Sequence, residues 1–236
     1  MKLLLAGILF AQATTGSPSR VENRTLASAE AGTITYGIAV PAGYTPDKPR
    51  PLVLALHPGG ERVAYQGSAF MRQIVLPALR DLDAIVVAPD APARSWIDPV
   101  SDRAVMALLE KVRGEYAIDE RRVLVTGFSM GGRGTWFMAS HHADIFTAAI
   151  PIAASLAGES TERLGTMPTY IIHSRNDQVV PFEPAARNAK ELERLGRTVR
   201  FEELNGVGHY QMGGYVEALG RAGRWVAERW AADPRR

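Results

Sequence analysis

The 236-residue chain contains no cysteine. This absence excludes disulfide bonds, thiolate nucleophiles, iron–sulfur clusters and zinc sites built on cysteine. A marked excess of one charge is also lacking, since 27 Lys and Arg residues stand against 25 Asp and Glu residues. Because no run of basic residues is interleaved with aromatic ones, the sequence predicts no nucleic-acid partner.

Long hydrophobic runs are absent too, and no stretch is long enough to predict a membrane-spanning helix. The N-terminus has a positive start, an apolar stretch from Leu3 to Ala11 and a small-x-small site, which is a short signal-peptide pattern. This pattern favours export to the periplasm or the medium over a cytoplasmic location. The sequence predicts three parts, namely a possible signal peptide at 1–13, a polar spacer at 14–30 and one folded domain at 31–236.

Two kinds of segment alternate after residue 31. Short aliphatic or β-branched segments predict strands, and segments with apolar residues three or four apart predict helices. The strands are expected at 33–40, 52–57, 84–88, 123–127, 148–152, 169–173 and 199–204. This alternation is typical of the α/β class, with a mostly parallel central sheet and helices on both faces.

A candidate nucleophile follows the strand at 123–127. The sequence Gly127-Phe128-Ser129-Met130-Gly131 has the pattern G-x-S-x-G between a predicted strand and a predicted helix. This spacing suits a very tight turn with Ser129 at its tip and glycines where side chains would collide with neighbouring backbone. An ordinary glycine-rich turn is the alternative. The strand before it and the helix after it favour the nucleophile.

A serine nucleophile needs a base, and the base needs an acid to orient it. In chains with this turn, the acid and then the base follow later strands. Asp177 lies in the polar loop after the strand at 169–173, and His209 lies after the strand at 199–204. The alternatives are a turn-capping role for Asp177 and a solvated loop position for His209. The chain order favours a Ser129–His209–Asp177 triad.

Acyl transfer also needs two backbone N–H groups that stabilise the developing oxyanion. One is expected from Met130, the residue after the nucleophile. The other is expected from the loop His57-Pro58-Gly59-Gly60 after an early strand. Since Pro58 has no N–H, Gly59 is the predicted donor, with Gly60 as the alternative.

No set of side chains has convincing metal-ligand spacing. His141, His142 and Asp144 lie together where a helix is expected to end, which explains them without a metal. The sequence therefore predicts neither a metal nor another cofactor.

Together these segments resemble the α/β-hydrolase superfamily over residues 32 to 232. The similarity is carried by 56–61, 116–122, 126–136, 146–152 and 173–181, and Gly127 to Trp136 is its most specific part. The branch that the chain resembles includes dienelactone-hydrolase-like proteins, feruloyl and acetyl-xylan esterases, polyhydroxyalkanoate depolymerases and predicted peptidases. This resemblance implies the α/β-hydrolase fold and the same triad. The chain departs from the family in having Pro58 where glycine usually follows the histidine, which leaves open which glycine completes the oxyanion hole.

The predicted function is hydrolysis of a carboxylic ester, small or linked to a polymer, through an acyl-enzyme. Only residues 153 to 167 separate two predicted strands, which is too few for a cap domain, so we expect an open site. Trp96, Phe128, Tyr210 and Met212 lie beside the site loops, where they would contact substrate or serve as packing. A peptidase with the same triad and a non-catalytic binding protein on this scaffold are the alternative functions.

Overall fold

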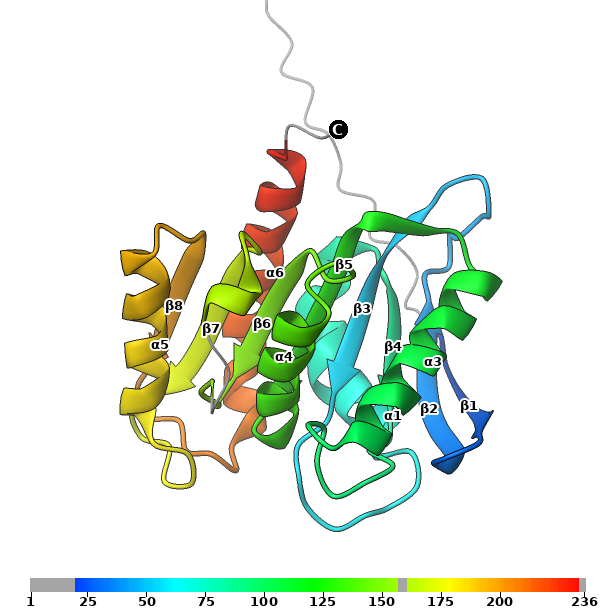
Figure 1. The fold of residues 1–236 in the computed structure, drawn as a ribbon, viewed down its shortest axis with the longest axis horizontal. Helices are drawn as coiled ribbons and strands as arrows, with labels where there is room; N and C mark the ends of the chain where they lie inside the picture. The colour runs from blue at the N-terminus through cyan, green and yellow to red at the C-terminus, as the bar shows by residue number, and fades with distance from the viewer. Residues whose placement is uncertain (1–19, 157–160, 234–236) are drawn as a thin grey trace, which may run out of the picture.

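The computed structural model describes residues 20–156 and 161–233. The possible signal peptide and the first part of the predicted spacer lie outside these residues. Within them, eight strands form one sheet in the order β1-β2-β4-β3-β5-β6-β7-β8 (Figure 1). The strands are β1 (Arg20–Ser28), β2 (Gly32–Val40), β3 (Arg50–Leu56), β4 (Ile85–Pro89), β5 (Ile118–Phe128), β6 (Ala148–Ile152), β7 (Thr169–Ser174) and β8 (Val199–Leu204).

The sheet is parallel from β4 to β8, and β2 runs antiparallel to both β1 and β4. Its middle strands are continuous aliphatic runs, because both of their faces are covered by helices. The α/β class and the mostly parallel sheet predicted from the sequence are confirmed.

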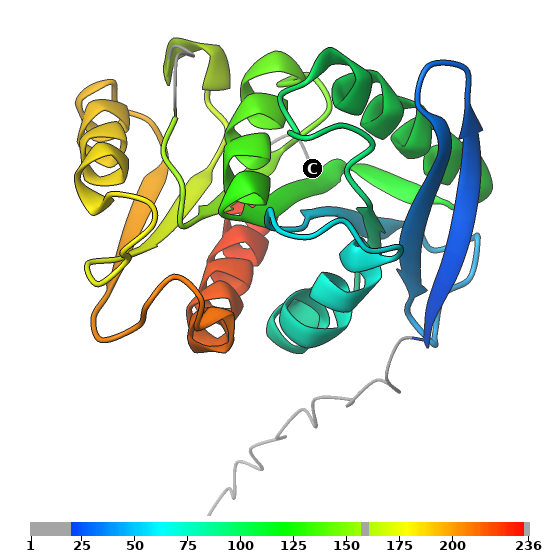
Figure 2. The same cartoon turned by 90° about the horizontal axis from the view of Figure 1, so that it is seen from below.

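Helices form one layer on each side of the sheet (Figure 2). The view from below shows α3, α4 and α5 over one face, and α6 with the helical segment around α1 over the other. The helical elements are α1 (Gln66–Phe70), the π-helical turn η1 (Met71–Val75), α2 (Leu76–Leu79), η2 (Arg80–Leu82), α3 (Pro99–Glu115), α4 (Met130–His141), η3 (Thr161–Leu164), α5 (Phe182–Arg194), η4 (Met212–Tyr215) and α6 (Val216–Ala231). None of the helices in the described part of the chain is both long and apolar enough to cross a bilayer.

The predicted start of the folded domain at residue 31 is wrong. Residues 20–28, assigned to the polar spacer, form β1 and pair with β2 along its whole length. This strand lies at the sheet edge and none of its residues is fully buried, so it carries no continuous apolar run that would reveal it. The described part of the connection between β6 and β7 contains only η3, in agreement with the absence of a cap domain.

The order of the strands places the site. From β3 the chain moves to β4 on one side, and it later returns to β5 on the other side of β3. Loops that follow such a pair of neighbouring strands diverge and leave a crevice at their carboxyl ends. The loops after β3, β4, β7 and β8 gather at the lower edge of Figure 1, where the candidate site lies.

Candidate active site

Ser129 lies in the tight turn that the sequence predicts between β5 and α4. Its backbone has φ 56° and ψ −112°, which is a strained conformation for a residue with a side chain. A Cβ on Gly131 would overlap the carbonyl oxygen of Leu56, and one on Gly127 would overlap the carbonyl oxygen of Gly131. The two glycines are therefore needed for the close approach of α4 to β3 and β5.

The three predicted triad side chains form one hydrogen-bonded chain. Nε2 of His209 lies 2.9 Å from Oγ of Ser129, and Nδ1 of His209 lies 2.7 Å from Oδ2 of Asp177. The residues come from three loops, after β5, β7 and β8. With Nδ1 donating to the carboxylate, Nε2 is left as the acceptor for the serine hydroxyl.

The carboxylate of Asp177 is held in place from both sides. Its Oδ1 accepts hydrogen bonds from the backbone N–H groups of Val179 (2.9 Å) and Val180 (2.8 Å), while Oδ2 faces His209. Its side chain has no exposed surface. The capping and triad interpretations of Asp177 thus describe the same carboxylate, whose loop-closing bonds orient the oxygen that faces His209.

His209 is also fixed through its backbone and its ring. Its N–H donates to Oε1 of Gln178 (3.1 Å), and its ring lies 5.0 Å from the ring of Phe128. Phe128 in turn packs edge-on against Tyr215. The phenol of Tyr215 is itself buried, and this burial raises its pKa to about 12. This apolar support restricts the imidazole to the plane in which it meets Ser129 and Asp177.

His173, the last residue of the predicted strand at 169–173, lies beside the carboxylate of Asp177. Its Nε2 donates to the carbonyl oxygen of Val180 (3.1 Å) and lies 3.6 Å from Oδ2 of Asp177. The side chain is fully buried, and burial lowers its pKa. A neutral His173 therefore holds the loop that carries Asp177. The four-residue spacing between the two was the only sequence signal for this contact.

The predicted oxyanion loop lies against the turn at Ser129. A Cβ on Gly59 would come 3.6 Å from both Cβ and Sδ of Met130, so the two predicted donors are neighbours. Gly60 has φ 147°, a conformation that residues with side chains rarely adopt. The geometry brings Gly59 next to Met130, the residue after Ser129, and the assignment of Gly59 and Met130 as oxyanion donors stays a prediction.

His57 ties the oxyanion loop to the loop after β4. Its Nδ1 donates to the carbonyl oxygen of Pro58 (2.7 Å), and its Nε2 accepts from the N–H of Ala91 (3.0 Å). Nε1 of Trp96 donates to the carbonyl oxygen of His57 (2.9 Å). Desolvation lowers the pKa of His57, which keeps the imidazole neutral and able to accept from Ala91.

The predicted substrate contacts of Trp96 and Phe128 are wrong. Trp96 has no exposed surface and Phe128 is 2% exposed, so both support the site loops from below instead of facing a ligand. In a sheet covered on both faces, large aromatic side chains beside a strand end fill the space under the loops. Tyr210 is 78% exposed beside His209, and Met212 is half-buried, so contacts of these two with substrate stay predictions.

His57→Ala is expected to lower the free energy of unfolding by about 1–3 kcal/mol, because it leaves the buried N–H of Ala91 unpaired. The wild type should also lose stability as the pH falls below 6.5. In the unfolded protein the imidazole of His57 then binds a proton, whereas in the folded protein its lowered pKa keeps it neutral. Urea denaturation between pH 7.5 and 5.0 measures both effects.

The control is His141→Ala, which removes an exposed imidazole. Urea denaturation of this variant over the same pH range gives the reference for the loss of an exposed imidazole. The slope should decrease in His57→Ala, leaving the contribution of His173, whose pKa burial also lowers. Equal slopes in the wild type and His57→Ala would show that His57 is not held neutral.

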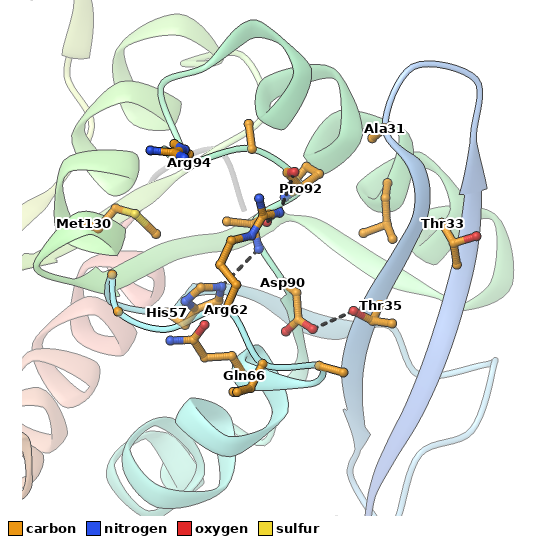
Figure 3. Close-up of a pocket in the computed structure, with 17 residues that line it drawn as sticks. Ala31, Thr33, Thr35, His57, Arg62, Gln66, Asp90, Pro92, Arg94 and Met130 are labelled. Carbon is orange, nitrogen blue, oxygen red and sulfur yellow. Dashed lines mark hydrogen bonds between the residues drawn. The ribbon is translucent and has the colours of Figure 1, made fainter.

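A cavity of about 610 Å³ opens beside the oxyanion loop (Figure 3). Its walls come from β2, from the loop after β3 and from the loop after β4, and Gly59 and Met130 form the side next to Ser129. Arg62 lies across it, with Nη2 donating to the carbonyl oxygens of Ala91 (3.0 Å) and Pro92 (2.7 Å). Among the described residues, no group of three or more His, Asp or Glu side chains is placed to hold a metal ion.

The strand order and the Ser129–His209–Asp177 arrangement place the protein in the α/β-hydrolase class. The chain belongs to the PET hydrolase-like family, whose model (PETase) matches residues 29–235. The predicted superfamily is thereby confirmed.

Individual relatives agree with this assignment. The chain is 27% identical over 152 residues to feruloyl esterase C of Emericella nidulans. The matched region covers 63% of this chain and 56% of that protein. It is 30% identical over 177 residues to cutinase est1 of Thermobifida alba, covering 75% and 54% of the two chains. A solved thermostable esterase superposes with a TM-score of 0.77 at 31% identity, covering 88% of this chain and 62% of that one.

The predicted resemblance to feruloyl esterases is confirmed, and the similarity to cutinases adds to it. The chain spans little more than half the length of these two curated relatives.

Proposed function

We propose that this protein hydrolyses carboxylic esters through an acyl-enzyme, with Ser129 as nucleophile, His209 as general base and acid, and Asp177 as the orienting carboxylate. The observation that carries the proposal is the uninterrupted hydrogen-bonded chain from Oγ of Ser129 to the buried carboxylate of Asp177. The esterase and cutinase names of the relatives support the same reaction class.

In the first half of the reaction, Oγ of Ser129 attacks the ester carbonyl and its proton passes to Nε2 of His209. The oxyanion that forms is stabilised by the backbone N–H groups of Met130 and Gly59. When the carbon–oxygen bond to the alcohol breaks, the leaving oxygen takes the proton from Nε2. Water then attacks the carbonyl of the acyl-enzyme and gives its proton to the same nitrogen. When the bond between the acyl carbon and Oγ of Ser129 breaks, Oγ takes this proton back, and the acid leaves.

The surface around Ser129 supports an ester with a bulky, apolar part. The exposed large hydrophobic residues of the described chain all lie in loops at the carboxyl ends of the strands, namely Val63, Ile97, Val179 and Tyr210. Ser129 itself is partly exposed, in agreement with an open site. Such a surface suits an ester attached to a polymer or another large partner. We also propose that residues 1–13 direct export, which would bring the enzyme to such a substrate.

A peptidase is the second candidate, because the same triad could cleave amides. The experiment that separates the two compares p-nitrophenyl butyrate with the matched butyryl p-nitroanilide on the purified protein. Turnover of the ester alone supports the proposed function, and comparable turnover of the anilide would replace it with an amidase. A fluorophosphonate probe should label Ser129 in either case, and a folded protein that is neither labelled nor active would be a binding protein.

A further inference from the structure

The cavity beside the oxyanion loop lies on one side of Ser129, away from the loops that carry Asp177 and His209. It is lined by Gly59 and Met130 but by no residue of the loops after β7 and β8, which carry Asp177 and His209. In the proposed reaction, the leaving alcohol must lie next to Nε2 of His209, because it takes its proton from that nitrogen. The acyl group then extends away from His209, toward this cavity.

The cavity carries cationic groups with free hydrogen-bonding capacity. Arg62 uses Nη2 on two backbone carbonyls, and for its Nε and Nη1 no partner is found among the described residues. The guanidinium of Arg94, which lines the same cavity, has no hydrogen bond or ion pair with any described residue. Figure 3 shows the Arg62 side chain between His57 and Pro92, and Arg94 on the loop after β4 at the upper left.

The one carboxylate in the cavity wall is already occupied. Oδ2 of Asp90 accepts from Oγ1 of Thr35 (2.5 Å) and from the N–H of Tyr65 (2.5 Å), and Oδ1 accepts from the N–H of Gly67 (2.7 Å). Neutral His57 adds no charge. The cavity therefore has an excess of positive charge, and its unused donors belong to arginines, which suit planar carboxylates.

We propose that this cavity is an acyl subsite for an acid that carries a second, anionic group at its far end, so that monoesters of dicarboxylic acids are preferred substrates. The inference rests on the proposed function and deepens it. The anionic group is bound and takes no part in the bond changes at Ser129. Arg94 is the main contact, since Arg62 also has a structural role in holding Ala91 and Pro92.

The test compares two esters that differ only at the far end of the acyl chain, mono-p-nitrophenyl adipate and p-nitrophenyl hexanoate. Wild type should hydrolyse the adipate with a higher kcat/KM, and the preference should decrease with added salt. Arg94→Gln should lower kcat/KM for the adipate roughly five- to tenfold and change the hexanoate value less than about twofold, as expected for a partly solvated charge pair.

Two controls make the result specific. Arg80→Gln removes the same charge from a side chain that is 81% exposed and outside the cavity, and it should change neither substrate. With 4-carboxyphenyl hexanoate, whose carboxylate is on the alcohol side, Arg94→Gln should have no effect. An equal loss on this ester and on the adipate would contradict the acyl-side assignment.

A wild type that hydrolyses the hexanoate as well as or better than the adipate would overturn the subsite and leave the proposed function intact. An equal loss on adipate and hexanoate in Arg94→Gln would also overturn it, because a structural role would then explain the loss. No hydrolysis of either ester, together with no labelling of Ser129 by a fluorophosphonate, would reject the proposed function and the subsite with it.

Discussion

Ser129→Ala is expected to reduce the turnover of p-nitrophenyl butyrate by roughly 10⁴-fold or more, to the limit of detection of a purified preparation. The loss is this large because no other group of the described residues lies at hydrogen-bond distance from Nε2 of His209. The backbone N–H groups of Gly59 and Met130 and the imidazole of His209 remain in the variant, but the proposed acyl-enzyme cannot form without the serine oxygen. The measurement is the steady-state rate of the wild type and the variant, purified side by side.

The strained backbone at residue 129 provides the matched control. Alanine keeps the Cβ and thus the strain at φ 56°, so Ser129→Ala should unfold at nearly the wild-type temperature. Glycine tolerates this conformation, and Ser129→Gly should be as inactive but more stable by about 1 kcal/mol. Retention of more than about a hundredth of the activity by both variants would show that another residue is the nucleophile.

Much of the site could be predicted because its components are local in sequence. The turn at Ser129 is a single strand–turn–helix segment, and its glycines are required by contacts with the neighbouring β3 and with the turn itself. Asp177 and His209 follow from chain order, since each occupies a loop after a recognisable strand. Their hydrogen-bonded arrangement in the structure agrees with that order.

The supporting contacts could not be predicted, because they join residues that only the folded sheet brings together. The bond from Ala91 to His57 spans two loops on neighbouring strands, and His173 meets Asp177 only after the chain turns back. The choice between substrate contact and packing for Trp96 stayed open for the same reason, since its position next to a site loop does not reveal that the ring is fully buried. Strand β1 was not predicted, because an exposed edge strand needs few apolar residues.

Asp177→Asn is expected to lower the turnover number by about 10³- to 10⁴-fold while leaving the protein folded. The amide oxygen should take over the hydrogen bonds from the N–H groups of Val179 and Val180, because an amide NH₂ cannot accept them. The NH₂ group would then face Nδ1 of His209, which must accept a hydrogen bond instead of donating one. That tautomer carries its proton on Nε2, so the base can no longer accept the proton of Ser129.

Comparison with Asp177→Ala separates the effect of Asp177 on the tautomer of His209 from its effect on the stability of the loop. Alanine loses the loop-closing bonds as well, so its free energy of unfolding should decrease by about 1–3 kcal/mol, whereas that of Asp177→Asn should stay near the wild-type value. If the asparagine variant is folded and loses less than about tenfold in kcat, Asp177 does not orient the base. If the asparagine variant is stable but nearly inactive, and the alanine variant is less stable with similarly low activity, Asp177 has both roles. It then closes the loop and sets the tautomer of His209.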